Sequence, residues 1–500
     1  MESTAGFINS LKNEGITHEP DEQLAMANTA ALLKKADEEY TKAIAGDLKG
    51  KLLPGDTIID PKYISEARHT ETFNGKEYKR PIVDLVQQGG GMYGIALVGY
   101  TYIMEKAGVR FYSLGGTSAG AINTILLGAV PDKVYKMESA FEPGTQATKS
   151  ELLAHIIANS HFHEFMDRPG FVGRLQETLI RNFKVVKWGF LLIWAAVFVT
   201  LYIVLGNIFK NNCSTCESRF YDFFVGPMSL LVFPVFVYIL AIAVLGKNFG
   251  INPGKAFYDW ITKILRHPFV GIHTTHQLQN RMKTENTFDG RDNTKESASI
   301  LFIASNLTHN RIVKFPQRAV DYWNPSENVN PAAYVRASMS IPFVFETFIP
   351  GTGHVDNYPQ NQAKVVDTRF VDGGMLSNFP IREFHNHTVE RPRFPTFGVL
   401  LSERDTVSDF KGVNLWNYIV SFLSTFRNFY DNDFLNSTDE IKSRVVLVNT
   451  KGFNWLDFWM GKETKEKLFV SGALAAIEQL KKFNFEEYQK IRTDEIQQST

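Results

Sequence analysis

The alternation of hydrophobic and polar stretches between residues 81 and 129 predicts two successive strand–helix units. An apolar strand signal at 81–88 (PIVDLVQQ) is followed by three glycines and a helical run that reaches about Ala107. A second strand signal, VRFYSL, leads through another glycine-rich turn into the helical run AINTILLGA. Strands that alternate with helices in this way predict a parallel sheet covered by helices.

Strand signals return in the second half of the chain. The stretch 297–315 reads as two strands joined by a turn, and TFGVLLSE at 396–403 reads as another strand. The expected fold class is therefore α/β, a mostly parallel sheet flanked by helices and interrupted by an insertion. The expected segments are an N-terminal helical region (1–80), two parts of the sheet domain (81–180 and 263–410), the insertion between them (181–262) and a C-terminal helical region (411–500).

Two long apolar runs fill the insertion. Residues 188–206 and 223–246 contain 19 and 24 positions, and neither run carries a charge. About 20 such residues are needed to cross a bilayer. The runs therefore predict a transmembrane helical hairpin, with a pair of fully buried helices as the alternative.

The charges around the hairpin predict its orientation. Two spans leave both flanks on one side of the membrane, and basic residues favour the cytoplasmic side. Basic residues are more frequent in the flanks (Arg181, Lys184, Lys187, Lys247, Lys255) than in the joining loop (Lys210, Arg219). An integral membrane protein with a cytoplasmic sheet domain is expected. The two cysteines of the chain, Cys213 and Cys216, fall in the joining loop, where either a disulfide or two free thiols would fit.

Composition narrows the class of partner. Lys+Arg and Asp+Glu are balanced at 53 each, so no basic excess points to nucleic acid. The hydrophobic fraction of 44% is ample for a large core. Nothing in the composition indicates an oligomeric state.

The turn after the second strand is typical of a nucleophilic serine. Gly116, Ser118 and Gly120 fit the pattern G-x-S-x-G, in which the serine sits on a strained strand-to-helix turn and small neighbours are required. The helix that follows would direct its N–H groups, including that of Ala119, toward developing negative charge.

The turn after the first strand is a candidate oxyanion hole. Gly89, Gly90 and Gly91 precede Met92 and lack side chains that would cover their N–H groups. Such donors stabilise the negative oxygen of a tetrahedral intermediate. An ordinary tight turn is the alternative.

An aspartate in a third glycine turn is the favoured base. Asp372 follows a strand signal in RFVDGGMLSNFP, and Gly373 and Gly374 would allow close approach to the serine loop. An aspartate with its ordinary pKa of about 3.9 is a weak base, but it can accept a proton that moves only as the serine attacks. A Ser–Asp–His arrangement using His385 or His387 is the alternative.

Together these motifs resemble the patatin-like phospholipase family. GGGMYG (89–94), which ends at Gly94, is similar to the family's oxyanion motif. GTSAG (116–120) is similar to its nucleophile elbow, and DGG (372–374) is similar to the turn that carries its catalytic Asp. YVRASMSIPFVFE (334–346) and the tail NWLDFWMGKETKEKLFVSGALAA are also similar to the family. Tyr93 departs from it, because the family commonly has Arg or Lys there.

The resemblance, which covers about 81–180 and 263–480, implies a patatin-like fold and a Ser118–Asp372 dyad. It implies hydrolysis of carboxylic esters of membrane lipids, as in a phospholipase A or lysophospholipase, through an acyl-enzyme and without a metal or other cofactor. The expected partners are a lipid substrate and the bilayer. A membrane-tethered binding protein that keeps the fold but not the reaction is the alternative class.

Overall fold

A computed structural model gives the arrangement of residues 4–167, 248–292, 296–351, 367–384, 389, 391–402 and 439–499, together with 196, 199–200, 203–204 and 207. Two compact units are distinguished. The first comprises Met1–Phe165, Lys255–Ser340 and Phe348–Thr500, and the second comprises Met166–Gly254 and Ile341–Thr347. The sheet, its covering helices and every candidate active-site residue belong to the first unit.

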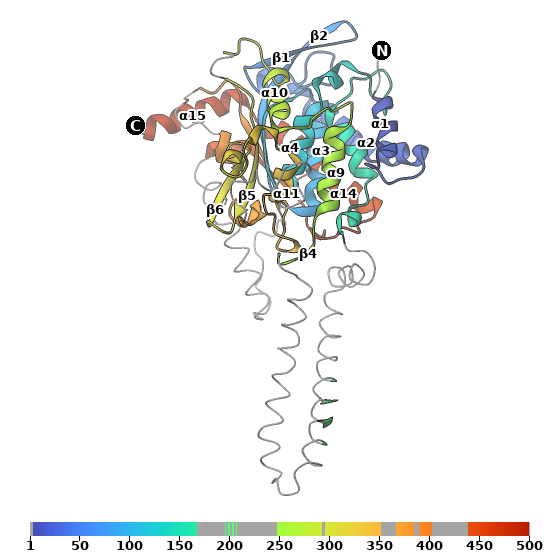
Figure 1. Cartoon of the computed structure of the whole chain (residues 1–500). Helices are drawn as coiled ribbons and strands as arrows, with labels where there is room; N and C mark the ends of the chain where they lie inside the picture. Colours follow the sequence, from blue (N-terminus) through green and yellow to red (C-terminus); the bar gives the residue numbers. More distant parts are fainter. Residues whose placement is uncertain are drawn as a thin grey trace. The chain divides into compact units, whose positions relative to one another are not determined.

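The described part of the first unit is built on an eight-stranded sheet (Figure 1). Its main path has the order β10-β9-β2-β3-β5-β6, with β1 paired to β2 and β8 paired to β5. The pairs β10–β9, β9–β2, β2–β3 and β3–β5 are parallel, and the pairs made by β1, β6 and β8 are antiparallel. The strands are β1 (Arg68–Phe73), β2 (Lys76–Gln87), β3 (Arg110–Thr117), β5 (Ile300–Asn306), β6 (Arg311–Phe315), β8 (Phe370–Asp372), β9 (Thr396–Ser402) and β10 (Val445–Asn449).

Helices precede, separate and follow the strands along the chain. The α-helices are α1 (Ala5–Asn13), α2 (Glu22–Ala45), α3 (Gly94–Lys106), α4 (Ala119–Ala129), α5 (Lys149–Ala158), α9 (Lys255–Arg266), α10 (Thr275–Glu285), α11 (Ala332–Ser338), α13 (Asp439–Arg444), α14 (Lys462–Lys482) and α15 (Phe485–Ser499). Short 3₁₀ turns include η1 (Lys49–Lys51), η2 (Pro61–Tyr63), η3 (Gly91–Tyr93), η4 (Asp132–Lys136), η5 (Phe162–Phe165), η6 (Ala319–Asp321), η7 (Ser326–Asn328), η9 (Gly373–Met375) and η10 (Ile381–Phe384). In the second unit β4 (Gly250–Asn252) pairs in parallel with β7 (Phe343–Phe345).

Both faces of the sheet are covered, as the predicted fold class requires. On one face, Gln87 of β2 exchanges side-chain hydrogen bonds with Asn123 and Thr124 of α4. The next residue toward the N-terminus, Val86, points to the opposite face because side chains alternate along a strand. There it packs in a buried cluster with Phe379, Ile381, Leu400 and Ile441. The α/β fold with a mostly parallel sheet is thus confirmed.

The predicted strand–helix units are also confirmed, whereas β1 and β10 were not predicted. The β1–β2 hairpin turns at Asn74 and Gly75, which both have positive φ (51° and 73°). Asn-Gly is the pair that two-residue hairpin turns favour, so the sequence contained a usable signal for β1.

The predicted membrane hairpin falls almost wholly outside the described residues. In its first run only residues 196, 199–200 and 203–204 are described, all of them helical, and among them Val199, Ile203 and Val204 are exposed. No helix in the described portion of the chain has the length and apolar character needed to cross a membrane. The described residues therefore do not support the hairpin, which stays a prediction.

Candidate active site

The strand register brings the three glycine turns to one edge of the sheet. Gln87 of β2 lies beside Gly116 of β3, so the turn that begins at Gln88 and the turn that holds Ser118 start next to each other. Thr117 lies beside Ile303 of β5, and the following residue, Ala304, pairs with Asp372 of β8. Ser118 and Asp372 therefore come together although they lie on different strands.

Ser118 occupies a strained turn between β3 and α4. Its backbone has φ 51° and ψ −116°, a conformation that residues with a side chain rarely adopt. The neighbouring glycines are required by contact, because a Cβ on Gly116 would strike the backbone of Gly120 and a Cβ on Gly120 would strike the carbonyl of Gln87. This is the geometry of a nucleophile elbow.

The hydroxyl of Ser118 donates a hydrogen bond directly to Asp372. The distance from Oγ to Oδ2 is 2.5 Å, and the two residues are only 2% and 8% exposed. The other carboxylate oxygen of Asp372, Oδ1, accepts the N–H of Gly374 at 2.7 Å. One oxygen is thus held by backbone while the other faces the serine, and a 2.5 Å contact leaves no room for a third side chain between them.

A short segment at the end of α11 holds both members of this pair. The N–H of Ser118 donates to Oγ of Ser338 at 2.8 Å, and the N–H of Asp372 donates to the carbonyl of Ser340, also at 2.8 Å. Buried Arg336 donates to Oγ of Ser340 at 2.6 Å. The sequence pointed to this stretch only through the resemblance of YVRASMSIPFVFE, and did not give these contacts.

The glycine turn after β2 lies directly against the serine. A Cβ on Gly89 would come within 2.9 Å of Ser118 Cβ, and Gly94 stands where a Cβ would be 3.0 Å from that of Ala119. Gly89 is further held by Asn378, whose carbonyl accepts the Gly89 N–H and whose side-chain amide donates to the Gly89 carbonyl, both at 3.1 Å. Asn378 was not singled out from the sequence.

The N–H groups of the turn divide into two pairs. Those of Gly89 and Met92 are engaged within the fold, the first by Asn378 and the second by the carbonyl of Trp455 at 2.9 Å. Within the described residues, no hydrogen bond is found for the N–H of Gly90 or Gly91. Of the four residues expected to form an oxyanion hole, Gly90 and Gly91 are thus the two with available donors.

The aromatic loop formed by residues 453–460, which precedes α14, supports this turn. Besides the Trp455 bond to Met92, the hydroxyl of Tyr93 donates to the carbonyl of Phe453 at 2.8 Å. Gly91 has φ 54°, and a Cβ there would strike the Trp455 carbonyl. Tyr93 therefore links the glycine turn after β2 to this loop, at the position where the family commonly has a basic residue.

The third turn also depends on close approach. A Cβ on Gly373 would strike the carbonyl of Ile303 and would lie 2.8 Å from Thr117 Cγ2. Gly374 contributes the N–H that holds Asp372. These two glycines let the strand that carries the aspartate reach the serine loop.

His385 and His387 lie outside the described residues, as do Cys213 and Cys216. Among the residues that the structure places, no group of three or more His, Cys, Asp or Glu side chains is arranged to hold a metal ion.

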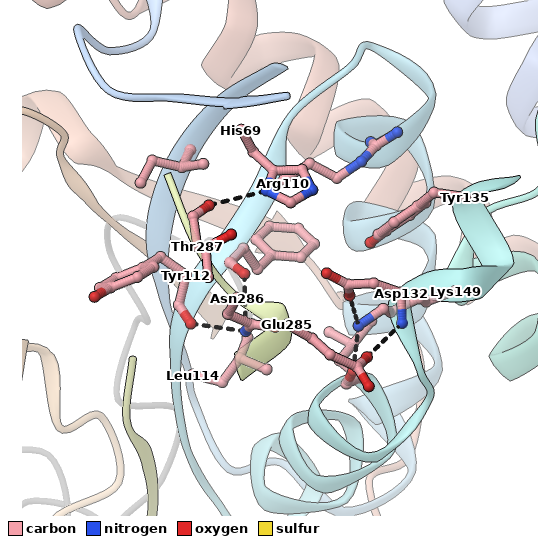
Figure 2. Close-up of a pocket in the computed structure, with 13 residues that line it drawn as sticks. His69, Arg110, Tyr112, Leu114, Asp132, Tyr135, Lys149, Glu285, Asn286 and Thr287 are labelled. Atoms are coloured by element: carbon pink, nitrogen blue, oxygen red, sulfur yellow. Dashed lines mark hydrogen bonds and ion pairs between the residues drawn. The ribbon is translucent and has the colours of Figure 1, made fainter. Parts of the chain in front are cut away.

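A small cavity away from the dyad is shown in Figure 2. It has a volume of about 20 Å³ and lies among Arg110, Asp132, Lys149 and Asn286. The Lys149–Asp132 ion pair (2.6 Å) closes one side of it. This volume admits about one water molecule. The cavity shares no residue with the serine, the aspartate or the glycine turns.

Comparison with known proteins places the chain in a family. The family described as patatin-like phospholipase matches residues 85–385, which is 301 of 500 residues. The uncharacterized protein YqhO of Bacillus subtilis (strain 168) is 23% identical over 391 residues, 78% of this chain and 95% of YqhO. The crystal structure of VipD from Legionella pneumophila aligns with 83% of this chain and 70% of VipD at 12% identity, with a TM-score of 0.31. Because the family match spans more than half of the chain and contains both Ser118 and Asp372, the chain belongs to the patatin-like phospholipase family.

Proposed function

We propose that the chain is a membrane-anchored serine hydrolase that cleaves carboxylic esters of membrane lipids, with Ser118 as nucleophile and Asp372 as base. The observation that carries the proposal is the direct 2.5 Å hydrogen bond from Ser118 Oγ to Asp372 Oδ2 at a strained strand-to-helix turn. The match to the patatin-like phospholipase family supports the class of reaction.

In the first step, Ser118 Oγ forms a bond to the ester carbonyl carbon while its proton passes to Asp372 Oδ2. A carboxylate is a weak base at neutral pH, but the serine proton becomes acidic as the new bond forms, so the transfer accompanies the attack. The Gly374 N–H on Oδ1 keeps the other oxygen directed at the serine.

The carbonyl oxygen becomes negatively charged in this step. The N–H groups of Gly90 and Gly91 would donate to it, and Ala119 at the start of α4 is a further candidate donor. The N-terminus of α4 adds the positive end of a helix dipole beside Ser118. Donors fixed in advance lower the barrier because they need no rearrangement as the charge develops.

Collapse of the intermediate then breaks the ester bond. The leaving alkoxide takes the proton from Asp372 and departs as the alcohol, which leaves an acyl group on Ser118 Oγ. Water attacks this acyl-enzyme with Asp372 again accepting a proton, and the fatty acid is released as the proton returns to Ser118 Oγ. Every proton is accounted for by the dyad and water.

The apolar insertion supports a lipid substrate and membrane anchoring. Runs of 19 and 24 uncharged residues are long enough to cross a bilayer. Val199, Ile203 and Val204 are helical and about half exposed, which suits side chains that contact lipid. A tethered enzyme meets its substrate at a high effective concentration. The basic flanks favour a cytoplasmic catalytic domain.

Release of fatty acid from phospholipid vesicles tests the function. The full chain should release fatty acid, and the Ser118→Ala variant, measured at the same protein concentration, should not. A variant that lacks 186–248, joined by a short flexible linker, should cleave a dispersed short-chain ester nearly as well as the full chain but act far less on vesicles. Equal release by the full chain and by Ser118→Ala would reject the hydrolase, and equal action of the deletion variant on vesicles would reject only the anchor.

A further inference from the structure

Two neighbouring phenylalanines of the second unit have exposed side chains. Phe249 is 59% exposed and Phe343 is 64% exposed. Phe343, at the start of β7, pairs with Gly250 of β4, so Phe249 is only one residue away from its partner position. Single exposed apolar residues are common, whereas neighbouring ones mark a surface that contacts another molecule or a membrane.

The backbone is left-handed at both phenylalanines. The φ angle is 56° at Phe249 and 67° at Phe343, values that bulky residues rarely adopt. Regular alternation would place Phe343 and Phe345 on the same face of β7. Phe345 is nevertheless only 1% exposed, so the left-handed residue separates an exposed ring from a buried one. Backbone strain of this kind concentrates at functional sites.

Hydrogen bonds hold the strand pair that carries these side chains. The N–H of Thr347 donates to the carbonyl of Asn248 at 3.0 Å, and the N–H of Glu346 donates to the carbonyl of Asn252 at 2.8 Å. The side-chain amide of Asn248 donates to Oε2 of Glu346, also at 3.0 Å. A Cβ on Gly250 would strike the backbone nitrogen of Glu346, so the two strands are in close contact. The exposed rings are therefore presented from a well-held element.

Exposed apolar side chains are concentrated in this unit. It contains five of the twelve large hydrophobic side chains that are exposed among the described residues, namely Val199, Ile203, Val204, Phe249 and Phe343. The charged side chains in its described part are Asp167 and Glu346. Both accept hydrogen bonds within the unit, from the N–H of Gly254 and from the amide of Asn248. No free charge of the described part thus opposes contact with an apolar phase.

The sequence next to the pair indicates a lipid surface as the partner. The uncharged run 223–246 ends three positions before Phe249. About 20 apolar residues cross a bilayer, so a residue that closely follows such a run is expected at the membrane–water interface. Aromatic side chains are favoured at this depth. Lys247, between the run and Phe249, adds a basic group suited to anionic head groups.

We propose that Phe249 and Phe343 enter the lipid interface and form an aromatic anchor beside the apolar insertion. The partner is a bilayer surface. The anchor adds a point of contact with lipid outside the two apolar runs. It rests on the membrane anchoring in the proposed function and is independent of the hydrolytic reaction.

Spin labelling of the full chain in vesicles of phosphatidylcholine and phosphatidylglycerol tests the anchor. The background carries Ser118→Ala, which leaves the vesicle lipid uncleaved. It also carries Cys213→Ser and Cys216→Ser, which remove the two cysteines of the chain so that each label has one attachment site. Electron paramagnetic resonance then measures collisions of the label with oxygen, which concentrates in lipid, and with nickel ethylenediaminediacetate, which stays in water.

The labels are introduced singly at the two anchor positions and at a matched control. Phe249→Cys and Phe343→Cys report on the anchor. Leu474→Cys is the control, because Leu474 is also apolar and 46% exposed but lies on α14 in the first unit. The labels at 249 and 343 should collide mainly with oxygen and should lose most collisions with the nickel complex. The label at 474 should show the opposite preference.

Three results would overturn the anchor in a chain that floats with the vesicles. Access of the nickel complex at 249 and 343 equal to that at 474 would place both rings in water. Low access of both reagents would show that protein covers the rings. Dipolar broadening between labels on different molecules would show that a second copy covers them.

Failure of the anchor can be told apart from failure of the proposed function. A chain that does not float with the vesicles would reject the membrane anchoring and this inference with it. Fatty acid release by the unaltered chain is measured separately and tests only the hydrolase. Thermal unfolding shows whether each labelled chain is folded, and either anchor position suffices if the other variant does not fold.

Discussion

The Oγ atom of Ser118 lies 2.5 Å from Oδ2 of Asp372, although 254 positions separate the two residues in the chain. The sheet register creates this proximity, because Thr117 pairs with Ile303 and Asp372 pairs with the next residue, Ala304. The end of α11 fixes both partners through Ser338 and Ser340. The proximity of Ser118 and Asp372 is therefore a product of the central fold, and the proposed role of each residue can be tested separately.

The two members of the dyad are expected to act as one unit. Ser118→Ala and Asp372→Asn should each lower kcat by about four orders of magnitude or more, and the double variant should cost little beyond either single change. Ester hydrolysis with purified variants measures this. His385→Ala and His387→Ala serve as controls and should retain most activity. Loss of turnover in either histidine variant, with the fold intact, would replace the dyad by a triad.

The oxyanion turn gives a second prediction. Gly90→Ala should lower kcat by about two to three orders of magnitude, as expected when a donor to the oxyanion is displaced. The added Cβ meets a side chain, Leu401 Cδ1, at 2.6 Å, so the fold should survive. Gly91→Ala should be worse, because Gly91 has φ 54° and the new Cβ would strike the Trp455 carbonyl.

A matched control is available for the glycine changes. Gly50 has nothing within 4 Å of an added Cβ and no positive φ, so Gly50→Ala should leave both turnover and thermal unfolding unchanged. Normal turnover in Gly90→Ala and Gly91→Ala would make this stretch an ordinary turn.

Tyr93 is expected to position the oxyanion turn through its hydroxyl. Tyr93→Phe removes the 2.8 Å hydrogen bond to the Phe453 carbonyl but keeps the ring. If loss of this bond raises the activation free energy by about 1 kcal/mol, kcat should fall roughly fivefold. KM should stay nearly unchanged, because the Tyr93 hydroxyl is not expected to contact the substrate. As a control away from the site, Tyr63→Phe removes the longer, exposed bond from Tyr63 to the Gly50 carbonyl (3.4 Å) and should not change kcat. Equal kcat values for Tyr93→Phe and the unaltered chain would reject the positioning role.

The sequence predicted the parts of this site that follow from local pattern. β2, α3, β3 and α4 were expected because apolar runs alternate with glycine turns, and Ser118 and Asp372 were expected from those turns. The hydrogen bond from the Met92 N–H to the Trp455 carbonyl was not predicted, because the two residues lie far apart in the sequence. β10 (Val445–Asn449) is a short strand and was missed. The support of Ser118 by Ser338 likewise arises only from tertiary packing.

Asp84, a buried acid in β2, should make the free energy of unfolding depend on pH. Burial raises the pKa of Asp84 to about 7, although the Ser113 N–H donates to its Oδ1 at 2.9 Å. The native state therefore holds a proton that the unfolded chain releases above about pH 4. The stabilisation is present below that pH and is lost as the pH rises toward 7.

Thermal unfolding between pH 4 and 7.5 tests this prediction. Asp84→Asn keeps an oxygen that accepts the Ser113 N–H but cannot ionise. The thermal unfolding midpoint of this variant should therefore rise relative to that of the unaltered chain as the pH increases. Asp47→Asn changes a surface carboxylate that pairs with Lys481 and should give a curve parallel to the unaltered one. A constant difference between Asp84→Asn and the unaltered chain across this range would show that Asp84 does not titrate there.

The central claim, that Asp372 activates Ser118, is tested most directly by reaction with a fluorophosphonate ester followed by intact-protein and peptide mass spectrometry. Such esters modify serines that are activated as nucleophiles. The account predicts one adduct, located on Ser118, that forms in the unaltered chain and forms at least about a hundredfold more slowly in Asp372→Asn, the usual contribution of a general base. An adduct on another residue, or an unchanged rate in Asp372→Asn, would contradict it.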